Sequence, residues 1–541
     1  MKKIGILSCI TLFIVTLLAA CSNNTTTKVD TSQSSDKSAS NSKKIIVGIT
    51  NAPGSFNPIN AVDHASVAIT DVLFQPLVQA DDKMNFVPML AQTIDTKDNQ
   101  TFTVKLQPNA KWTDGQPVTA DDVLFTVKLI ANPDVISENS YGFSILDGFD
   151  SGGKLPKGTT ELKSVKKVDA QTLEFKTANP VDANLFKEKV AQNIKTLPLH
   201  VLKDADPKSI ETNPFMQKPN VVNGPFKLVK YAKDQYVELE ANADYFKGAP
   251  KVKSLFFKIM PSANLVAQLQ SGEIDMNFPG IGNIDAVDYD KVKTLENITV
   301  KSGVSLDTQI FIMNTLTIND AKLRQAIVYA INRKTIVDSL LKGFGQVIDG
   351  PYTPAHPYFN KNLQITPYDP EKAKQLLKEA NWDASKTLTM VVPTGNKVRE
   401  QTADIFAENL KAVGIKAKIE KFDISTVVGK AIKHDFDLLM LGSFTTVDPD
   451  VSAEFKTGGV NNFSAYSNKE MDALIDQGMK ETDPSKREVI YDKIQEVLER
   501  DRPGTSIYAQ VPFAAVSKKV IVGEPKQIGM LINVHEWDVN K

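Results

Sequence analysis

The sequence predicts an α/β fold that contains a parallel sheet. The prediction rests on three observations within residues 388–441: short apolar runs have the length of strands, amphipathic helical segments separate them, and Gly, Pro and Asn stand at the junctions. Strands that alternate with helices in this way pair in parallel through right-handed crossovers. The chain of 541 residues is 42% hydrophobic and 23% charged, which is typical of a globular protein and excludes wholesale disorder.

The N-terminus has the features of a signal peptide. Two lysines precede residues 4–18, an apolar run that is short for a membrane span and has the length of a signal-peptide core. The run ends in Leu-Ala-Ala-Cys, which resembles the cleavage box of lipoproteins. We therefore expect residues 1–20 to be removed and Cys21 to be lipidated. The alternative is an ordinary signal peptide followed by a chance cysteine.

Residues 21–43 are predicted to form the lipidated cysteine and a flexible tether. Ser, Thr, Asn and Lys dominate this segment and apolar side chains are nearly absent, so nothing offsets the entropy cost of ordering it. Two acyl chains on one residue are enough for stable attachment to a membrane. The folded body is therefore expected to begin near residue 44.

The first half of the body contains several predicted elements. Residues 45–49 form a short apolar run that suits a buried strand, and the loop that follows at 51–58 is rich in breakers. Alternation of apolar and polar residues over 102–106 predicts a half-buried strand. Thr119, which stands before two aspartates, predicts the start of a helix that continues to Ile130.

The second half of the body is more regular. Residues 320–342 are predicted to be largely helical, and Asp369 followed by Pro and Glu is a strong signal for the start of another helix. Strands are then predicted at 388–392, 415–419 and 436–441, with helical segments between them. This order of elements is the source of the predicted parallel sheet.

Three loops lie where a ligand would be expected to bind. In open parallel sheets, ligands sit outside the carboxyl ends of the strands. Loops 393–396 and 442–450 both follow strands of the parallel unit, so we expect them at the same edge of that sheet. Loop 51–57 has the same relation to the first strand. If the chain forms two lobes, these loops face each other across a cleft.

Composition excludes several classes of function. The formal net charge of -1 argues against a nucleic-acid-binding protein. Two cysteines, Cys9 and Cys21, exclude a disulfide scaffold, and five scattered histidines disfavour a metal site, so we expect no cofactor. The sequence has no Gly-x-Ser-x-Gly, His-Glu-x-x-His or phosphate-loop motif. A surface-anchored hydrolase is therefore disfavoured, and we do not expect an enzyme.

Several long motifs resemble those of a known family. The most specific is FTVKLQPNAKWTDGQPVTADDVLFTVKLIANP at 102–133, and others are LQSGEIDM at 269–276, LRQAIVYAINRKTIV at 323–337 and YDPEKAKQLLKEANW at 368–382. In this order they resemble the extracytoplasmic solute-binding proteins of family 5, which include the oligopeptide- and dipeptide-binding lipoproteins of ABC importers. The resemblance covers nearly all of residues 44–541.

The resemblance implies a two-lobed fold like that of the periplasmic binding proteins (type II, cluster C), with an extra subdomain in the first lobe. On this chain we place the first lobe at residues 44–309 and 512–541, with the extra subdomain at about 61–210. The second lobe is placed at residues 310–511. The chain is expected to cross between the lobes near residues 310–314 and 507–513.

The resemblance also implies a function without covalent chemistry. Such a protein captures di-, tri- or oligopeptides between its lobes, closes by a hinge motion, and delivers them to the permease and ATPase subunits of an ABC importer. The expected location is the outer face of a Gram-positive cell membrane, where the lipid on Cys21 holds a monomer. A receptor of the same fold for a pheromone or signal peptide is the alternative.

Candidate peptide contacts come from the loops at the strand ends and from neighbours that the resemblance brings to the cleft. Loop backbone groups and small polar side chains can satisfy the backbone of an extended peptide whatever its sequence. The candidates are Asn51, Gly54, Ser55, Phe56, Tyr141, Asn396, Arg399, Ser443, Phe444, Thr445, Thr446, Asp448, Asp450, Asn462 and Phe463.

Within this set, an acidic residue is expected to hold the peptide's α-amino group, because a buried ammonium must be paired. Short-peptide receptors of the family that this chain resembles carry a Gly-Trp-Thr-Gly-Asp motif, whereas this chain has Gly-Ser-Phe-Thr-Thr at 442–446. Asp448 or Asp450 could substitute for the missing aspartate, and the alternative for both is a turn or helix cap. Arg399 is a candidate for binding a carboxylate, against an exposed position in the first turn of a helix.

Overall fold

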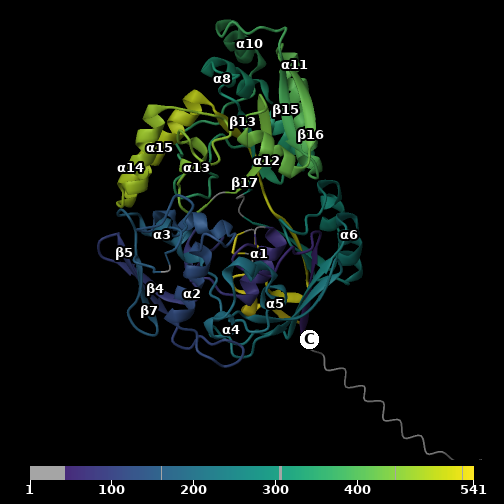
Figure 1. Cartoon of the computed structure of the whole chain (residues 1–541). Coiled ribbons are helices and arrows are strands. Elements are labelled where there is room, and N and C mark those ends of the chain that lie inside the picture. The colour runs from purple at the N-terminus through teal and green to yellow at the C-terminus, as the bar shows by residue number, and fades with distance from the viewer. Residues whose placement is uncertain are drawn as a thin grey trace, which may run out of the picture. The chain divides into compact units, whose positions relative to one another are not determined.

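Two large sheets organise the folded chain (Figure 1). The structure is a computed structural model, and it describes residues 43–540 except 62, 160, 304–306, 445, 527 and 530. The predicted signal peptide, Cys21 and nearly all of the predicted tether lie outside the described residues.

The sheet of the first lobe has seven strands. Their order is β12 (Ile298–Ser302), β19 (Phe513–Ser517), β11 (Met276–Asn277), β1 (Lys44–Ile49), β10 (Ser254–Ile259), β9 (Tyr236–Ala241) and β8 (Phe226–Ala232). β1 runs parallel to β10 and β11, and the other neighbouring strands are antiparallel. Ile45, Val47 and Ile49 of β1 are fully buried, as expected for the apolar run at the start of the body.

A smaller antiparallel sheet lies within the segment that the sequence assigned to the extra subdomain. Its order is β4 (Ala91–Thr96), β5 (Thr101–Leu106), β7 (Thr172–Lys176) and β6 (Val165–Lys167). The predicted strand at 102–106 is β5, and Phe102, Val104 and Leu106 are fully buried. The predicted helix start is also confirmed, because α2 (Ala120–Ala131) follows Thr119, whose backbone N–H donates to the Asp122 carboxylate at 2.8 Å. The other helices of the first lobe are α1 (His64–Leu73), α3 (Ala183–Lys189), α4 (Leu199–Leu202), α5 (Pro214–Gln217), α6 (Ser262–Ser271) and α7 (Tyr289–Lys293).

The sheet of the second lobe has six strands. Their order is β14 (Gly345–Gln346), β18 (Gly504–Gln510), β13 (Asp307–Met313), β17 (Leu438–Phe444), β15 (Thr387–Pro393) and β16 (Lys416–Phe422). β15 is parallel to β16 and β17, as predicted. The sheet as a whole is mixed, because the chain enters it along β13 and leaves it along β18, and β13 is antiparallel to both β17 and β18.

Most of the predicted helices of the second lobe are present. Residues 320–342 are largely helical as predicted, and they form two helices, α8 (Ala321–Ala330) and α9 (Arg333–Leu340). Asn332 separates them, because its side chain accepts a hydrogen bond from the Thr335 N–H at 3.1 Å and so starts a new helix. The other helices of the second lobe are α10 (Pro370–Glu379), α11 (Lys397–Ala412), α12 (Ile424–Ile432), α13 (Ser452–Phe455), α14 (Lys469–Lys480) and α15 (Pro484–Asp501).

The chain passes twice between the two large sheets. β12 ends at Ser302 and β13 begins at Asp307, so the first passage lies between these two residues. β18 ends at Gln510 and β19 begins at Phe513, so the second passage lies at residues 511–512.

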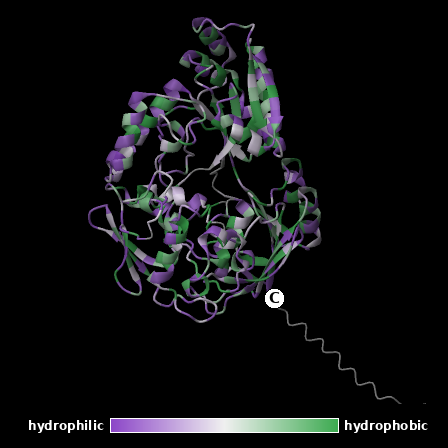
Figure 2. Ribbon diagram, in the orientation of Figure 1, coloured by the Kyte–Doolittle hydropathy of each residue, from purple (hydrophilic) through white to green (hydrophobic). Residues whose placement is uncertain are grey.

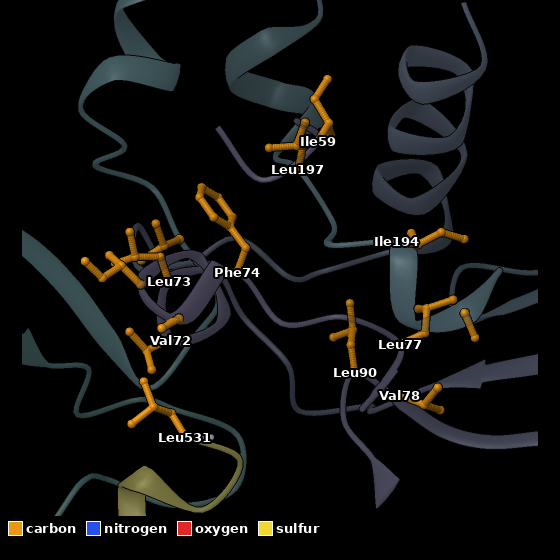
Figure 3. Packing of buried hydrophobic residues seen from close by; sticks show 14 of the residues in the cluster. Ile59, Val72, Leu73, Phe74, Leu77, Val78, Leu90, Ile194, Leu197 and Leu531 are labelled. Carbon is orange, nitrogen blue, oxygen red and sulfur yellow. The ribbon is translucent and has the colours of Figure 1, made fainter. Parts of the chain in front are cut away.

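Separate hydrophobic cores support the two sheets. Figure 3 shows part of the first, in which Val72, Leu73 and Phe74 near the end of α1 belong to the same buried cluster as Leu197 and Leu531 from distant parts of the sequence. The second core packs the sheet of the second lobe against α8, α10 and α11. Hydrophilic and hydrophobic residues alternate along α14 and α15 in Figure 2, which is the pattern of helices that cover a core with one face.

Candidate functional site

A cavity of about 600 Å³ lies in the second lobe against one face of its sheet. β13, β17 and β18 form its floor, and its walls come from residues 346–365, α13 and the last turns of α15. The volume is within the range of sites that hold small organic molecules.

The lining of this cavity is largely apolar with separate polar groups. Apolar side chains include Ile310, Ile312, Tyr352, Phe359, Leu363, Leu441, Phe455 and Leu498. Polar and charged side chains include Asp349, Asn360, Glu454, Asn461, Gln495, Glu499, Arg502 and Ser506. Such a surface can receive side chains of mixed chemistry while a few polar groups orient the ligand.

Four of the residues predicted for the site, Ser443, Thr446, Asp450 and Phe463, line this cavity. Ser443 is held in β17, where its carbonyl accepts a hydrogen bond from the Thr308 hydroxyl at 3.3 Å. The Thr446 hydroxyl donates to the backbone carbonyl of Asp448 at 2.7 Å and so shapes the loop that follows β17. The structure therefore places the end of β17 and part of the loop after it on the lining of this cavity.

Asp448 points away from this cavity into a buried ion pair. Its carboxylate accepts two hydrogen bonds from the Arg487 guanidinium, at 2.7 and 3.0 Å, and the Asp448 residue is only 1% exposed. Asp182 of the first lobe adds a second carboxylate at 3.6 Å from Arg487. Burial lowers the pKa of Arg487, but the neighbouring carboxylates more than offset this effect and hold the pKa above its ordinary value. Asp448 is thus already paired within the protein.

Contacts between the lobes surround the same loop. The Lys189 ammonium of α3 lies 3.0 Å from the Asp450 carboxylate. Burial disfavours both charges, yet each partner stabilises the other, so the pKa of Asp450 lies below and that of Lys189 above its ordinary value. The carboxylate of Glu188 accepts hydrogen bonds from the backbone N–H groups of Val447 and Asp448, at 3.0 and 3.3 Å. Burial and the nearby Asp448 raise the pKa of Glu188.

The first-lobe loop predicted to line the cleft does not contact this cavity. Phe56 is buried and packs edge-to-face on the Tyr231 ring, with 5.1 Å between the ring centroids. The N–H of Ser55 donates to the Ser66 hydroxyl at 3.0 Å, and the Gly54 N–H donates to the Asp63 carboxylate at 3.4 Å. Asn51 and Gly54 are exposed.

Arg399 and Asn396 begin helix α11 at the carboxyl end of β15. The Asn396 side chain caps the helix by accepting a hydrogen bond from the Arg399 N–H at 2.9 Å. The Arg399 guanidinium is half-buried, and its Nε donates to the Gln309 side chain of β13 at 2.8 Å. Burial lowers the pKa of Arg399. Neither residue lines the cavity.

The remaining predicted residues have different surroundings. Tyr141 is 54% exposed on a short 3-10 helix, Glu138–Ile145, of the first lobe. Asn462 is buried and donates to the carbonyls of Lys456 and Tyr466, at 3.0 and 2.7 Å, so it orders its own loop. Phe444 is the last residue of β17, and Thr445 lies outside the described residues.

Two parts of the site were missed by reasoning from the sequence. The first is residues 346–365, which wall the cavity and carry the run Pro-Tyr-Thr-Pro-Ala-His-Pro-Tyr-Phe at 351–359. A long connection without regular structure is often functional, so its length was an available signal. The second is α3, whose Glu188 and Lys189 reach the loop after β17; no local pattern marks such a contact.

Two further features bear on the type of site. Among the described residues, no group of three or more His, Cys, Asp or Glu side chains is arranged to hold a metal ion. In the same part of the chain, none of the helices combines the length and apolar character needed to cross a bilayer.

Comparison with known proteins relates this geometry to a family. Residues 85–463 match the family model described as bacterial extracellular solute-binding proteins, family 5 Middle. The oligopeptide-binding protein AppA of Bacillus subtilis is 29% identical over 544 residues, which cover 96% of each chain. Its solved structure in complex with a nonapeptide is similar to the present structure with a TM-score of 0.77 and 28% identity, covering 92% of this chain and 99% of that one.

A second solved structure supports the same relationship. The ABC transporter substrate-binding protein CtaP of Listeria monocytogenes matches with a TM-score of 0.81 and 26% identity, covering 92% of this chain and 100% of that one. The predicted two-lobed α/β fold and the predicted family are therefore confirmed. The chain belongs to the bacterial extracellular solute-binding proteins of family 5.

Proposed function

We propose that this protein captures peptides outside the cytoplasm and delivers them to the permease of an ABC importer. The observation that carries the proposal is the cavity of about 600 Å³ beside the loop where the two lobes meet. Its aromatic and aliphatic walls suit peptide side chains, and its separate polar groups suit the polar atoms of a peptide backbone. Two similar proteins support the proposal: AppA is described as an oligopeptide-binding protein, and CtaP is described as an ABC transporter substrate-binding protein.

The proposed mechanism is capture and release without covalent chemistry. An extended peptide must find partners for its backbone N–H and C=O groups when it is buried. We propose that such partners come from the cavity lining, which includes the predicted polar residues Ser443, Thr446 and Asp450. Closure of the lobes through contacts such as Lys189–Asp450 would then create the surface that the permease reads.

The proposed location follows from the N-terminal sequence. Lipidation of Cys21 would hold a monomer on the outer face of the membrane, and the polar segment after it would let the folded body reach the permease. Permease and ATPase subunits of the importer are the proposed protein partners.

Mass spectrometry of material that co-purifies with the protein tests this function. The protein is isolated from cell extract, washed and denatured, and the released compounds are identified. We expect unmodified peptides, and their masses would report both length and composition. A release of sugars, metal complexes or haem without peptides would contradict the proposal, as would peptides that are cleaved during prolonged incubation with the purified protein.

A further inference from the structure

Glu188 places a carboxylate at the contact between the lobes without a cation beside it. The residue belongs to α3 of the first lobe and is half-buried. Its Oε2 accepts hydrogen bonds from the N–H groups of Val447 and Asp448 in the second lobe, at 3.0 and 3.3 Å, and its Oε1 accepts one from the Gln192 amide at 2.6 Å. Among the described residues, no lysine, arginine or histidine nitrogen lies within 4.0 Å of this carboxylate. Neutral donors, rather than an opposite charge, therefore hold it in place.

The contact around Glu188 carries more negative than positive charge. The Lys189 ammonium lies 3.0 Å from the Asp450 carboxylate, and the Arg487 guanidinium donates to both carboxylate oxygens of Asp448, at 2.7 and 3.0 Å. Both cations therefore have partners other than Glu188. In the described part of the chain, the two cations meet five carboxylates here, those of Asp182, Glu188, Asp448, Asp450 and Glu454.

Other titratable groups near this contact do not pair with Glu188. His356 lies against the backbone of the loop after β17, and burial lowers its pKa to about 4, so the imidazole is neutral. Glu138 and Tyr141 lie on the 3-10 helix that packs against α3, and within the described residues neither makes a hydrogen bond or ion pair with Glu188. The carboxylate of Asp448 is therefore the charge that acts most directly on Glu188.

Closure of the lobes changes the surroundings of Glu188. Because α3 and the loop after β17 belong to different lobes, a hinge motion that parts the lobes separates them and returns the carboxylate to water. In the closed form, burial and the nearby Asp448 raise the pKa of Glu188, and the three hydrogen bonds that favour the charged form do not offset them. The closed form therefore binds a proton at this carboxylate more readily than the open form does.

The surroundings of Glu188 can accept the protonated form. A carboxylic acid needs an acceptor for its proton, and the Gln192 side chain has both an NH₂ donor and a carbonyl acceptor. Rotation of the Gln192 amide would let its carbonyl accept a hydrogen bond from protonated Oε1. Oε2 would still accept the hydrogen bonds from Val447 and Asp448, so the contact with the second lobe would be kept.

We propose that closure of the lobes on a peptide takes up a proton at Glu188, so that the protein holds peptides more tightly in mildly acidic surroundings and releases them more readily as the pH rises. This inference rests on the proposed peptide-binding function. A peptide that favours the closed form and a proton that favours the same form must strengthen each other's binding. The affinity for peptide therefore rises as the pH falls. It levels off below about pH 4.3, the ordinary glutamate pKa, where the open form is protonated as well.

The direction of this dependence separates Glu188 from two other groups at the contact. The pKa of Asp450 lies below its ordinary value because Lys189 stabilises its charge against the effect of burial, so acid weakens that ion pair. Protonation of His356 is opposed by burial. Acid would therefore weaken the closed form through either of these groups and strengthen it through Glu188. Burial and Asp450 also raise the pKa of Glu454, so a variant is needed to distinguish Glu454 from Glu188.

Equilibrium dialysis at two pH values tests the proposal. Purified protein freed of co-purified material is dialysed against a pool of random pentapeptides without Asp, Glu, His or Cys, at about pH 5.0 and about pH 6.5, and bound peptide is quantified by mass spectrometry. The α-carboxyl and α-amino groups of such peptides change little in charge over this range, because their pKa values are about 3.5 and about 7.8. We expect the affinity of the wild-type protein for the pool to be at least three-fold higher at the lower pH.

Two variants connect this dependence to one residue. Glu188→Gln resembles the protonated side chain in size and charge, so we expect its affinities at the two pH values to agree within two-fold and to match that of the wild type in acid. Glu296→Gln removes an exposed carboxylate just before β12 and should follow the wild type. Thermal melting at both pH values checks that each protein is folded.

The outcomes distinguish this inference from the proposed function. A wild-type protein that binds the pool equally at the two pH values, or more weakly in acid, would overturn the role of Glu188 and leave peptide capture standing, even if Glu188→Gln did not fold. Tighter binding in acid that persists in folded Glu188→Gln would overturn it as well and would point to Glu454. A wild-type protein that binds no peptide at either pH would overturn both.

Discussion

The ammonium of Lys189 lies 3.0 Å from the carboxylate of Asp450, and this ion pair joins α3 of the first lobe to the loop after β17 in the second. The adjacent Glu188 accepts hydrogen bonds from two backbone N–H groups of the same loop. Val447 from this loop packs in a small apolar cluster with Ala80 and Met84 of the first lobe. The lobes are therefore closed on each other, and one short loop carries contacts of three chemical kinds between them.

Removing the Lys189–Asp450 ion pair should favour the open form. Lys189→Met and Asp450→Asn each delete one charge, and a double-mutant cycle should give a coupling of about 1–2 kcal/mol because Asp450 is nearly buried. We expect a peptide bound to either variant to dissociate about ten times faster, measured by stopped-flow fluorescence. Lys187→Met removes a charge from the same helix and is the control. Equal rates in all four proteins would show that the pair does not hold the lobes together.

The Asp448–Arg487 pair should contribute strongly to stability. Asp448→Asn leaves the buried Arg487 guanidinium without its main partner, so we expect the free energy of unfolding in urea to fall by about 3–5 kcal/mol. Asp338→Asn removes an exposed partner of Lys334 and should change stability by less than about 0.5 kcal/mol. Combining Asp448→Leu with Arg487→Met should recover much of the loss. If Asp448→Asn changes the free energy of unfolding only slightly, Arg487 does not depend on this carboxylate, and Asp448 would be available to bind a ligand.

His356 should make stability depend on pH. The residue is 3% exposed and its ring stacks on Tyr352 with 4.5 Å between centroids, and burial lowers its pKa from 6.5 to about 4. The folded protein therefore holds His356 neutral where the unfolded chain already binds a proton. The contribution of neutral His356 to the free energy of unfolding is complete above pH 6.5. It is lost as the pH falls from 6.5 towards 4, by up to about 1.4 kcal/mol per pH unit.

Denaturant unfolding at several pH values checks this dependence. Other groups also titrate in this range, so the quantity to compare is the difference between the wild type and His356→Gln. We expect the wild type to lose more stability than the variant between pH 6.5 and 4. Parallel pH profiles for the two proteins would mean that the imidazole is not held neutral.

Filling the cavity should reduce peptide binding. Leu363 is half-buried and lines the cavity, so Leu363→Trp should narrow it without disturbing a core, and we expect at least a ten-fold loss of affinity by calorimetric titration. Leu316→Trp changes a leucine that is 66% exposed elsewhere in the second lobe and should bind as the wild type does. Unchanged affinity in Leu363→Trp would place the peptide outside this cavity.

Cys21 should attach the protein to the membrane. Cys21→Ala removes the sulfur that would carry the lipid, so we expect the protein in the culture medium instead of the membrane fraction, as followed by immunoblotting. Ser22→Ala changes the neighbouring residue without removing the sulfur and should leave the protein on the membrane. Retention of Cys21→Ala would show that another segment anchors the chain.

Local features of the fold could be predicted because they depend on neighbours in the sequence. The Asp369 carboxylate caps α10 by accepting a hydrogen bond from the Lys372 N–H at 2.8 Å, and Asn396 caps α11 in the same way. Alternation of strand and helix similarly predicted that β15 would run parallel to β16 and β17. In each case the interacting groups are a few residues apart, or the connection between them allows few topologies.

The partners of the charged residues could not be predicted in this way. The sequence marked Asp448 and Asp450 as ligand anchors with equal weight, yet packing pairs the first with Arg487 and the second with Lys189. The same packing places Glu454 on the cavity lining, where it interacts with both Asp450 and Lys189. A cap needs only a short stretch of chain, whereas the neutralisation of a buried charge depends on which distant segments meet, and that is settled when the lobes and their connecting loops pack.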